Sequence, residues 1–246
     1  MLRKDGRGPN QMREIRIELG VNKYAEGSAQ IALGDTKVIC TASQEDRVPQ
    51  WLRGQGHGWI TAEYGMLPRS TDVRTQREAS RGRPSGRTQE IQRLIGRSLR
   101  AVTQLSAIGE RTIWIDCDVI QADGGTRTAS ITGGFVALAL AFRKMRDRDQ
   151  LLKKPLTGLV AATSVGILEG TPSLDLSYEE DSRADVDMNI VRTSAQKYVE
   201  VQGTAEKTPF TPEEMQKMLQ LANDGIDRLF ERQRSLLSDF LPALLQ

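Results

Sequence analysis

The residues best suited to chemistry are two adjacent glycines, a threonine and an arginine, placed between a strand pattern and a helix pattern. The strand pattern covers residues 111–119, and apolar residues recur at helical spacing over 128–147. Backbone N–H groups and the positive end of the helix dipole make such a turn suited to anions. We therefore predict a phosphate site at Gly125, Thr126 and Arg127, whose planar guanidinium matches phosphate oxygens.

A plainer interpretation of this turn stays open. The glycines could form an ordinary turn, with Thr126 or Thr128 as the N-cap of the helix. The segment has neither the Gly-Lys-Ser/Thr of a Walker A loop nor a Gly-x-Gly-x-x-Gly fingerprint. Arg87 immediately precedes another helical pattern at 88–104, where it could join Arg127 around one anion.

A second group of side chains is acidic. Asp185, Asp187 and Asn189 alternate with apolar residues of an expected strand, so they share one face. Asp181 precedes them in the connecting turn. Carboxylates gathered in a turn suit Mg²⁺, which proteins hold together with waters and substrate phosphates. The alternative is a solvated acidic hairpin without a metal.

A third feature is an arginine-rich segment. Residues 68–86 are rich in Arg, Ser, Thr, Gly and Pro, which predicts a long loop, and such loops in compact domains are usually functional. The loop lacks the apolar face of a membrane-binding segment and the aromatic platform of a base-reading surface. We expect contact with an RNA backbone, largely independent of base sequence. The alternative is a solvated loop that pairs with acidic groups of a partner chain. The arginines from this loop through the following helix are Arg69, Arg74, Arg77, Arg81, Arg83, Arg87, Arg93, Arg97 and Arg100.

The bulk composition excludes several classes of protein. No apolar run approaches the ~20 residues needed to cross a bilayer, and residues 1–7 lack the apolar stretch of a signal peptide. Cys40 and Cys117 each lie in an apolar strand pattern, which predicts buried thiols rather than a disulfide or a metal pair. The lone His57 has no partner for a zinc site. We expect a cytoplasmic protein that does not bind membranes.

These groups must be positioned by strands and helices, and the periodicity predicts both. Each half of the chain contains strands followed by a helix, so the simplest architecture is one α+β domain, residues 1–246, of two related halves. The third expected helix starts after Thr211 and Pro212 and ends near Leu237. The expected strands are residues 13–19, 28–33, 36–42, 59–64, 111–119, 159–168, 174–178, 186–193 and 198–204.

These features occur within long strings that resemble the bacterial ribonuclease PH family. The strings appear in the family's order and cover nearly the whole chain without a large insertion. The resemblance implies a single ribonuclease PH-type domain with a ribosomal protein S5 domain 2-like fold. The strings are Asp5-Gly6-Arg7, GWITAEYGMLPR at 58–69, GRTQEIQRLIGRSLR at 86–100, DCDVIQADGGTRTAS at 116–130 and DSRADVDMN at 181–189.

The resemblance implies a phosphate-dependent 3′-to-5′ exoribonuclease that trims the 3′ ends of tRNA precursors, with rRNA processing as a further role. Inorganic phosphate attacks the last phosphodiester and releases a nucleoside 5′-diphosphate, and the reverse reaction transfers nucleotides to RNA. Mg²⁺ is the implied cofactor. The implied assembly is a homohexameric ring built as a trimer of dimers.

The family's functional residues fall on matching positions of this sequence. The resemblance assigns phosphate binding to Arg87, Gly125, Thr126 and Arg127. It assigns the metal, and a role in proton transfer, to Asp181 and Asp187 without deciding which aspartate donates the proton. The arginines that it assigns to RNA binding are Arg69, Arg74 and Arg77.

Two other functions can be weighed against this expectation. An inactive RNA-binding ring subunit would be indicated by loss of Arg87, Arg127 or the paired aspartates, and all of them are present. A nucleoside triphosphate-dependent kinase would be indicated by a glycine-rich phosphate loop with a lysine, and none occurs.

Overall fold

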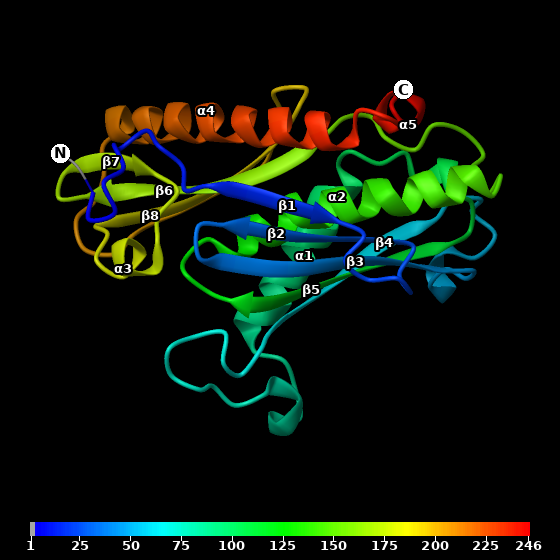
Figure 1. Cartoon of the computed structure of the whole chain (residues 1–246), viewed down its shortest axis with the longest axis horizontal. Coiled ribbons are helices and arrows are strands. Elements are labelled where there is room, and N and C mark those ends of the chain that lie inside the picture. The colour runs from blue at the N-terminus through cyan, green and yellow to red at the C-terminus, as the bar shows by residue number, and fades with distance from the viewer. Residues whose placement is uncertain (1–2) are drawn as a thin grey trace.

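Two β-sheets form the frame of the molecule (Figure 1). The computed structural model describes residues 3–246, apart from the side chain of Arg81. The first sheet has five strands in the order β1-β2-β3-β5-β4, of which only the β4/β5 pair is parallel. Its strands are β1 (Ile15–Leu19), β2 (Gly27–Leu33), β3 (Thr36–Glu45), β4 (Trp59–Met66) and β5 (Thr112–Gln121).

The second sheet is antiparallel and has the order β7-β6-β8-β9. Figure 1 shows it beside the first sheet, with the long helix α4 lying across it. Its strands are β6 (Val160–Leu168), β7 (Thr171–Leu174), β8 (Val186–Thr193) and β9 (Tyr198–Ala205). The helices are α1 (Gly86–Arg100), α2 (Thr126–Asp147), α3 (Tyr178–Asp181), α4 (Pro212–Leu237) and α5 (Leu241–Leu244), with 3-10 turns η1 (Gln50–Leu52), η2 (Glu78–Arg81) and η3 (Leu105–Ala107).

Helix α2 is the centre of the core. It packs on β2 and β3 of the first sheet and also contacts β6 of the second. Most of its residues are therefore buried, as expected of a helix that is apolar on all sides. A Cβ at Gly133 would lie 2.8 Å from Ile31 Cγ2 and 2.9 Å from Cys40 Sγ, so this glycine permits the close helix–sheet packing.

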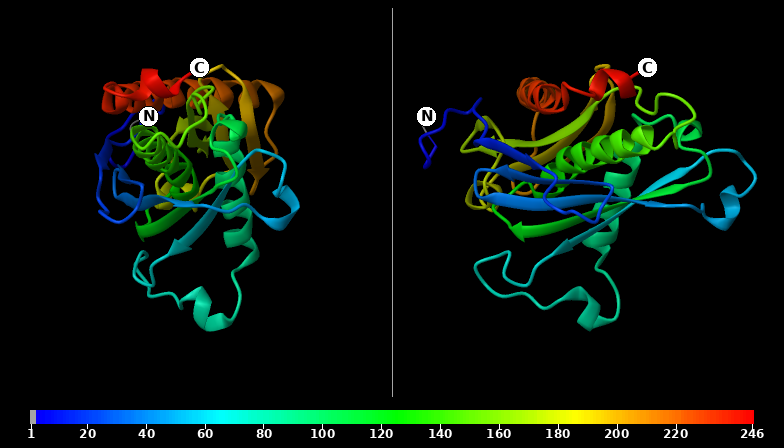
Figure 2. Two further views of the ribbon diagram at one scale, coloured as in Figure 1. Left: turned by 90° about the vertical axis from the view of Figure 1, so that its right-hand side faces the viewer. Right: turned by 45° about the vertical axis from the view of Figure 1, so that its right-hand side comes forward.

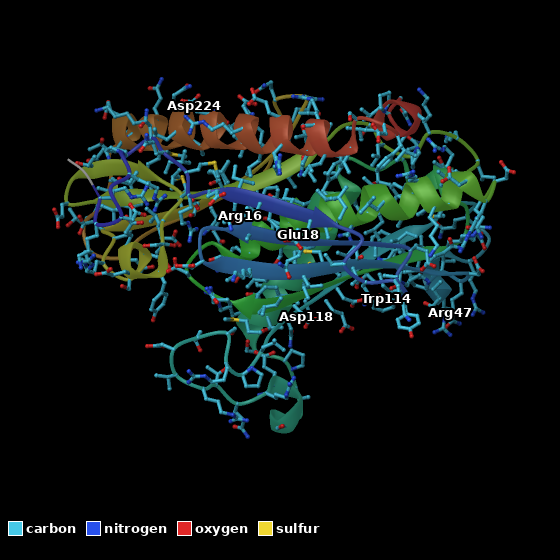
Figure 3. The ribbon with its side chains drawn as sticks, viewed as in Figure 1. Arg16, Glu18, Arg47, Trp114, Asp118 and Asp224 are labelled. Atoms are coloured by element: carbon cyan, nitrogen blue, oxygen red, sulfur yellow. The ribbon has the colours of Figure 1, made fainter. Side chains whose placement is uncertain are left out.

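In the part of the chain that the structure describes, no helix covers the opposite face of the first sheet (Figure 1). Period-2 alternation directs Ile113, Ile115 and Cys117 of β5 into the core and leaves the residues between them outside. Figure 3 labels residues on this outer face, among them Arg16, Glu18, Trp114 and Asp118.

Most expected elements are confirmed within a few residues, including the α+β class. Ser85 caps α1, since its hydroxyl accepts from Thr88 N, and Thr211 forms a capping box with Glu214 at α4. Cys40 and Cys117 are buried free thiols on paired strands, as predicted.

The expected strand 174–178 is wrong. Strand β7 ends at Leu174, because Asp175 adopts a left-handed backbone conformation with φ of 54°. Ser177 then starts α3 through a capping box with Glu180, so the local side-chain hydrogen bonds favour a helical turn over strand pairing. Asp181 is consequently the last residue of a short helix rather than part of an open turn.

The segment between β4 and α1 projects away from both sheets as an extended loop that contains η2 (Figure 2). This matches the loop expected at 68–86. Among the residues described, no helix is both long and apolar enough to span a membrane.

Candidate functional site

The expected phosphate and metal residues lie around one cavity. The cavity has a volume of about 900 Å³ and lies where the N-terminus of α2 meets α3 and β8 of the second half. The N-terminal turn of α1 completes it. Its lining includes Arg87, Gly125, Thr126, Arg127, Asp181 and Asp187.

The N-terminus of α2 is open to a ligand. Gly125 is the N-cap with φ of 67°, and no side chain of the described residues caps this helix. The hydroxyl of Thr128 donates to Gly125 O at 2.8 Å, and it forms no cap hydrogen bond with an N–H group of the first turn. The interpretation of Thr126 or Thr128 as an N-cap is thus wrong, and the N–H groups remain available to an anion.

Gly124 brings the two halves of the molecule into contact. Its φ is 74°, and a Cβ on it would lie 2.4 Å from Leu176 O and 2.8 Å from Tyr178 N. Only glycine fits this position, because a side chain would be strained and would collide with the backbone before α3. We name Gly124, Gly125, Thr126 and Arg127 together the cradle. The cradle therefore packs, through Gly124, against the segment that leads into α3 and Asp181.

A buried arginine, Arg13, holds the backbone of the cradle by hydrogen bonds. Arg13 donates through Nη1 to Asp123 O and through Nη2 to Gly124 O at 3.4 Å. Its Nε and Nη2 also form a bidentate pair with Asp175 at 3.0 and 2.7 Å. Burial lowers the pKa of Arg13, but the hydrogen bonds and the charge of Asp175 outweigh it, so the net pKa is raised. Arg13 precedes β1, whereas Asp175 follows β7, so this pair also joins the two halves.

Two hydroxyl groups support the cradle at its ends. Thr36 Oγ1 donates to Gly124 O at 2.6 Å and accepts from Asp123 N at 2.9 Å. The hydroxyls of Thr126 and Tyr64 lie 2.8 Å apart and are hydrogen-bonded. Burial raises the pKa of Tyr64, and this hydrogen bond and the nearby arginines oppose the rise only in part. The phenol is thus neutral and adds no charge beside the phosphate site.

The two arginines that are expected to bind phosphate, Arg87 and Arg127, differ in how they are held. Arg127 Nη1 donates to Gln202 Oε1 at 2.8 Å and lies 3.6 Å from Glu90 Oε1, and Gln202 Nε2 donates to the same carboxylate at 2.9 Å. This network orients Arg127, whose side chain is only 11% exposed. Arg87 is exposed at the second position of α1. Both arginines act electrostatically on the two aspartates.

Asp181 lies close enough to Asp187 to influence the ionisation of Asp187. Burial raises the pKa of Asp181, although the charges of Arg87 and Arg127 oppose it. Burial, followed by the negative charge of Asp181, raises the pKa of Asp187 to about 6. Asn189 Nδ2 lies 3.4 Å from Asp187 Oδ2 as a hydrogen-bond donor. Paired carboxylates that repel each other are a suitable donor set for a cation.

The acidic cluster is smaller than the sequence indicated. Asp187 and Asn189 face the cavity from β8, but Asp185 precedes the strand and lines a separate cavity of about 460 Å³. The expectation that Asp185 shares their face is wrong, because the alternation holds only where the chain is extended. Across residues 3–246 no group of three His, Cys, Asp or Glu side chains could hold a metal. Asp181 and Asp187 still fit Mg²⁺, which commonly takes one or two carboxylates and completes its shell with waters and phosphates.

The arginine loop borders the cavity without entering it. Thr71, Asp72, Val73 and Thr75 line the cavity. The three arginines assigned to RNA, Arg69, Arg74 and Arg77, are exposed and are absent from its lining. Arg69 Nη1 donates to Asp72 O at 2.6 Å, which orients its side chain within the loop. The structure therefore places these arginines outside the cavity, on a loop whose neighbouring residues line it.

Comparison with known proteins decides the family. The model of the 3′ exoribonuclease family, domain 1, matches residues 11–144, and that of domain 2 matches residues 158–225. The chain belongs to the 3′ exoribonuclease family. It is 58% identical over 237 residues to "Ribonuclease PH" of Syntrophomonas wolfei subsp. wolfei, which covers 96% of this chain and 99% of that relative. The chain is thus a phosphorolytic exoribonuclease of the ribonuclease PH type, a class of enzymes that processes tRNA 3′ ends.

Solved structures share the fold. A chain of the Archaeoglobus fulgidus exosome with RNA bound to the active site has a TM-score of 0.78 at 22% identity, covering 94% of this chain and 92% of that chain. Rice (Oryza sativa) Rrp46 has a TM-score of 0.77 at 20% identity, with coverages of 96% and 100%. An archaeal exosome core has a TM-score of 0.73 at 21% identity, with coverages of 95% and 90%.

In this exoribonuclease, the residues that hold the cradle in place by hydrogen bonds could not be predicted from the sequence. The cradle is contacted by three residues from distant parts of the chain, and no local pattern in the sequence marks them. They are Arg13 and Thr36 at Gly124, and Gln202 at Arg127. Tyr178 was missed for a different reason. It belonged to an expected strand, whereas the structure places it at the N-terminus of α3 and in the cavity lining.

Proposed function

We propose that the chain removes nucleotides from the 3′ ends of tRNA precursors by phosphorolysis at this cavity, and that rRNA is a further substrate. One observation supports the proposal above all others. A single cavity contains an uncapped helix N-terminus, two arginines and two carboxylates, which are the groups that two phosphates and a metal ion require.

The cradle would bind the attacking phosphate. The N–H groups that follow Gly125 and the side chains of Arg87 and Arg127 would neutralise its charge. Arg127 would define the geometry, because Gln202 and Glu90 already orient its guanidinium. The exposed Arg87 would complete the site once phosphate binds. Holding the nucleophile in line with the phosphodiester is the main contribution that a protein can make to this reaction.

Asp181 and Asp187 would hold Mg²⁺ in the same cavity. When bound, the metal supplies stabilisation of the negative charge that develops on the scissile phosphodiester. Phosphate attack breaks the bond to the 3′-oxygen of the shortened RNA, and that oxygen needs a proton. Asp181 or Asp187 would donate this proton when it is not bound to the metal, and the raised pKa of metal-free Asp187, about 6, favours Asp187 in that role.

The test is whether degradation depends on inorganic phosphate. A short RNA labelled within its last nucleotides should release nucleoside diphosphates in phosphate buffer and remain intact without phosphate. Thin-layer chromatography of the products distinguishes diphosphates from monophosphates. Monophosphates released in phosphate-free buffer would mean hydrolysis and would exclude this mechanism.

The assembly that we propose is a homohexameric ring, built as a trimer of dimers, in the cytoplasm. The resemblance to ribonuclease PH supports it, and the similar fold of an archaeal exosome core is consistent with a multi-subunit assembly. Light scattering after size-exclusion chromatography should give six times the protomer mass. A monodisperse monomer at micromolar concentration would contradict the ring.

A further inference from the structure

One aromatic side chain in the cavity has no role in the proposed chemistry. Tyr178, the first residue of α3, lines the cavity with 64% of its surface exposed. Val73, in the arginine loop, and Met66, at the end of β4, line the same cavity and are 71% and 38% exposed. Exposed apolar side chains bordered by polar groups commonly mark a ligand site. This group of three lies beside the cradle, so its ligand is part of the same substrate.

The backbone that carries Tyr178 is held rigidly. Tyr178 N donates to Asp123 Oδ1 at 3.1 Å, and Ser177 and Glu180 form the capping box of the turn. Gly124 approaches Tyr178 N so closely that a Cβ there would lie 2.8 Å away. The ring is thus exposed although its attachment is fixed, which is the arrangement that a stacking surface requires.

The location of the Tyr178 ring limits which nucleotide of the RNA can contact it. The backbone of Tyr178 lies against Gly124 of the cradle. Asp181 follows one turn later in α3, where its N–H donates to Ser177 O at 2.9 Å. If phosphate and the scissile phosphodiester occupy this region, as the proposed function requires, the nearest base is that of the nucleotide being removed.

We propose that Tyr178 stacks on the base of the 3′-terminal nucleotide, with Val73 and Met66 contributing the apolar contacts that the other half of the molecule makes to this base. Every nucleobase has a π-face, so stacking binds all four bases and suits an enzyme that must remove whichever nucleotide comes last. This base subsite rests on the proposed function for its location. It adds a contact that is independent of the arginine loop.

The experiment measures binding without turnover. Fluorescence anisotropy, in phosphate-free buffer with a metal chelator, compares a short RNA with the same RNA whose 3′-terminal nucleotide lacks its base. Tyr178→Ala should weaken binding of the intact RNA roughly 5- to 20-fold, within the range of one base–aromatic stack. It should leave binding of the abasic RNA unchanged. Tyr178→Phe should behave as the wild type, because the ring remains.

A matched control is Tyr24→Ala, since Tyr24 is 81% exposed and does not line the cavity. It should bind both RNAs as the wild type does. Equal losses for the intact and abasic RNAs in Tyr178→Ala would overturn the subsite. So would a loss that disappears only when the penultimate base is removed, because the stack would then belong to another nucleotide.

The two proposals fail separately. Phosphate-independent degradation by the wild type would overturn phosphorolysis, whereas the binding cycle uses no phosphate and reports only on the base contact. Phosphate-dependent release of diphosphates together with identical losses for both RNAs would retain the function and exclude the stack.

Discussion

At the residue scale, Asp181 and Asp187 are ionisable groups whose surroundings disfavour their charge. Burial raises the pKa of both carboxyls even though Arg87 and Arg127 act in the opposite direction. A cation between the carboxylates would remove their repulsion, and a substrate phosphate would offset the excess charge of the arginines. The site therefore combines groups that are unfavourable alone and compatible once both ligands bind.

Replacing either aspartate should separate catalysis from RNA binding. Asp181→Asn and Asp187→Asn should each lower turnover by at least about 100-fold, because a metal ligand or proton donor is lost. RNA affinity in a gel-shift assay should change little, since the arginine loop is intact. Asp185→Asn is the matched control, because Asp185 lies outside the cavity. Near-normal turnover of both variants at low Mg²⁺ would remove the support for the metal assignment.

Asp187 should also make stability depend on pH. Its folded pKa, about 6, exceeds the ordinary value of 3.8, so ionisation favours the unfolded state. Stability is fully present below about pH 4, falls as pH rises towards 6 and stays reduced above it. Asp187→Asn should thus be more stable than the wild type at pH 8 by up to about 3 kcal/mol, and equal to it near pH 4.

Urea denaturation at one fixed protein concentration, with a metal chelator, measures this difference. Adding Mg²⁺ at pH 8 should stabilise the wild type and leave Asp187→Asn nearly unaffected. The difference in the free energy of unfolding between the two proteins should therefore become smaller. A gap that is equally large at pH 4 and pH 8 would show that ionisation of Asp187 is not its cause.

Among the structural elements, the proposed function gives separate tasks to the loop between β4 and α1 and to the N-terminus of α2. The loop presents exposed arginines, whereas the cradle presents N–H groups and an oriented guanidinium. Long-range attraction of a polyanion needs only exposed charge, while phosphate positioning needs fixed geometry. This explains why one element is an extended loop and the other is packed in the core.

Removal of the loop's charges should affect RNA and not phosphate. Arg69, Arg74 and Arg77 replaced together by alanine should weaken binding of all RNA sequences alike. Each lost phosphate contact should flatten the slope of log affinity against log salt by about 0.7. The KM for phosphate should change little, because Arg87 and Arg127 remain.

The same variant distinguishes an oligomer interface from an RNA surface. If these arginines pair with a partner chain, size-exclusion chromatography would show smaller particles, and use of phosphate would be lost with RNA binding. Unchanged particle size, RNA affinity and salt slope would contradict both interpretations.

At the scale of the whole molecule, the site depends on how the halves dock. The buried pair of Arg13 and Asp175 joins the segment before β1 to the segment after β7, and the same guanidinium supports the cradle. Gly124 packs on the backbone before α3 at the same junction. Any change in docking should therefore move the phosphate site relative to the aspartates.

Arg13→Met should lower stability by up to about 3–5 kcal/mol, because it removes the bidentate partner of the buried Asp175 carboxylate and leaves Arg7, 3.6 Å away, as its remaining ion pair. Arg13→Lys should fold more stably than Arg13→Met but raise the KM for phosphate, since a lysine cannot bind Asp175 and two carbonyls at once. Arg16→Met is the control, because Arg16 pairs with Glu14 on the exposed face of β1 and should contribute little (Figure 3). Chemical denaturation and phosphate titration give the two readouts, and equal behaviour of Arg13→Met and Arg16→Met would refute the role of Arg13.

Groups whose chemistry depends on a few neighbouring residues could be predicted without the structure. The α+β class followed from alternating and helical periodicity, and the cradle followed from glycines between a strand and a helix, because both signals lie within a few neighbouring residues. The capping boxes are also local signals, because each is formed by two residues three positions apart. Ser177 and Glu180 have the spacing of a capping box in the sequence, and the structure forms α3 there, where a strand was expected.

Which of these groups come into contact depends on the folding of the whole chain. Asp185 and Asp187 look equivalent in sequence, but only the pairing of β8 directs one of them into the cavity. Arg13 and Asp175 are 162 residues apart, and Arg127 and Gln202 are 75 apart. Contacts over such separations depend on how the sheets pack around α2, which no local pattern encodes. The raised pKa of Asp187 likewise comes from burial and from Asp181 across the cavity, so it exists only in the folded molecule.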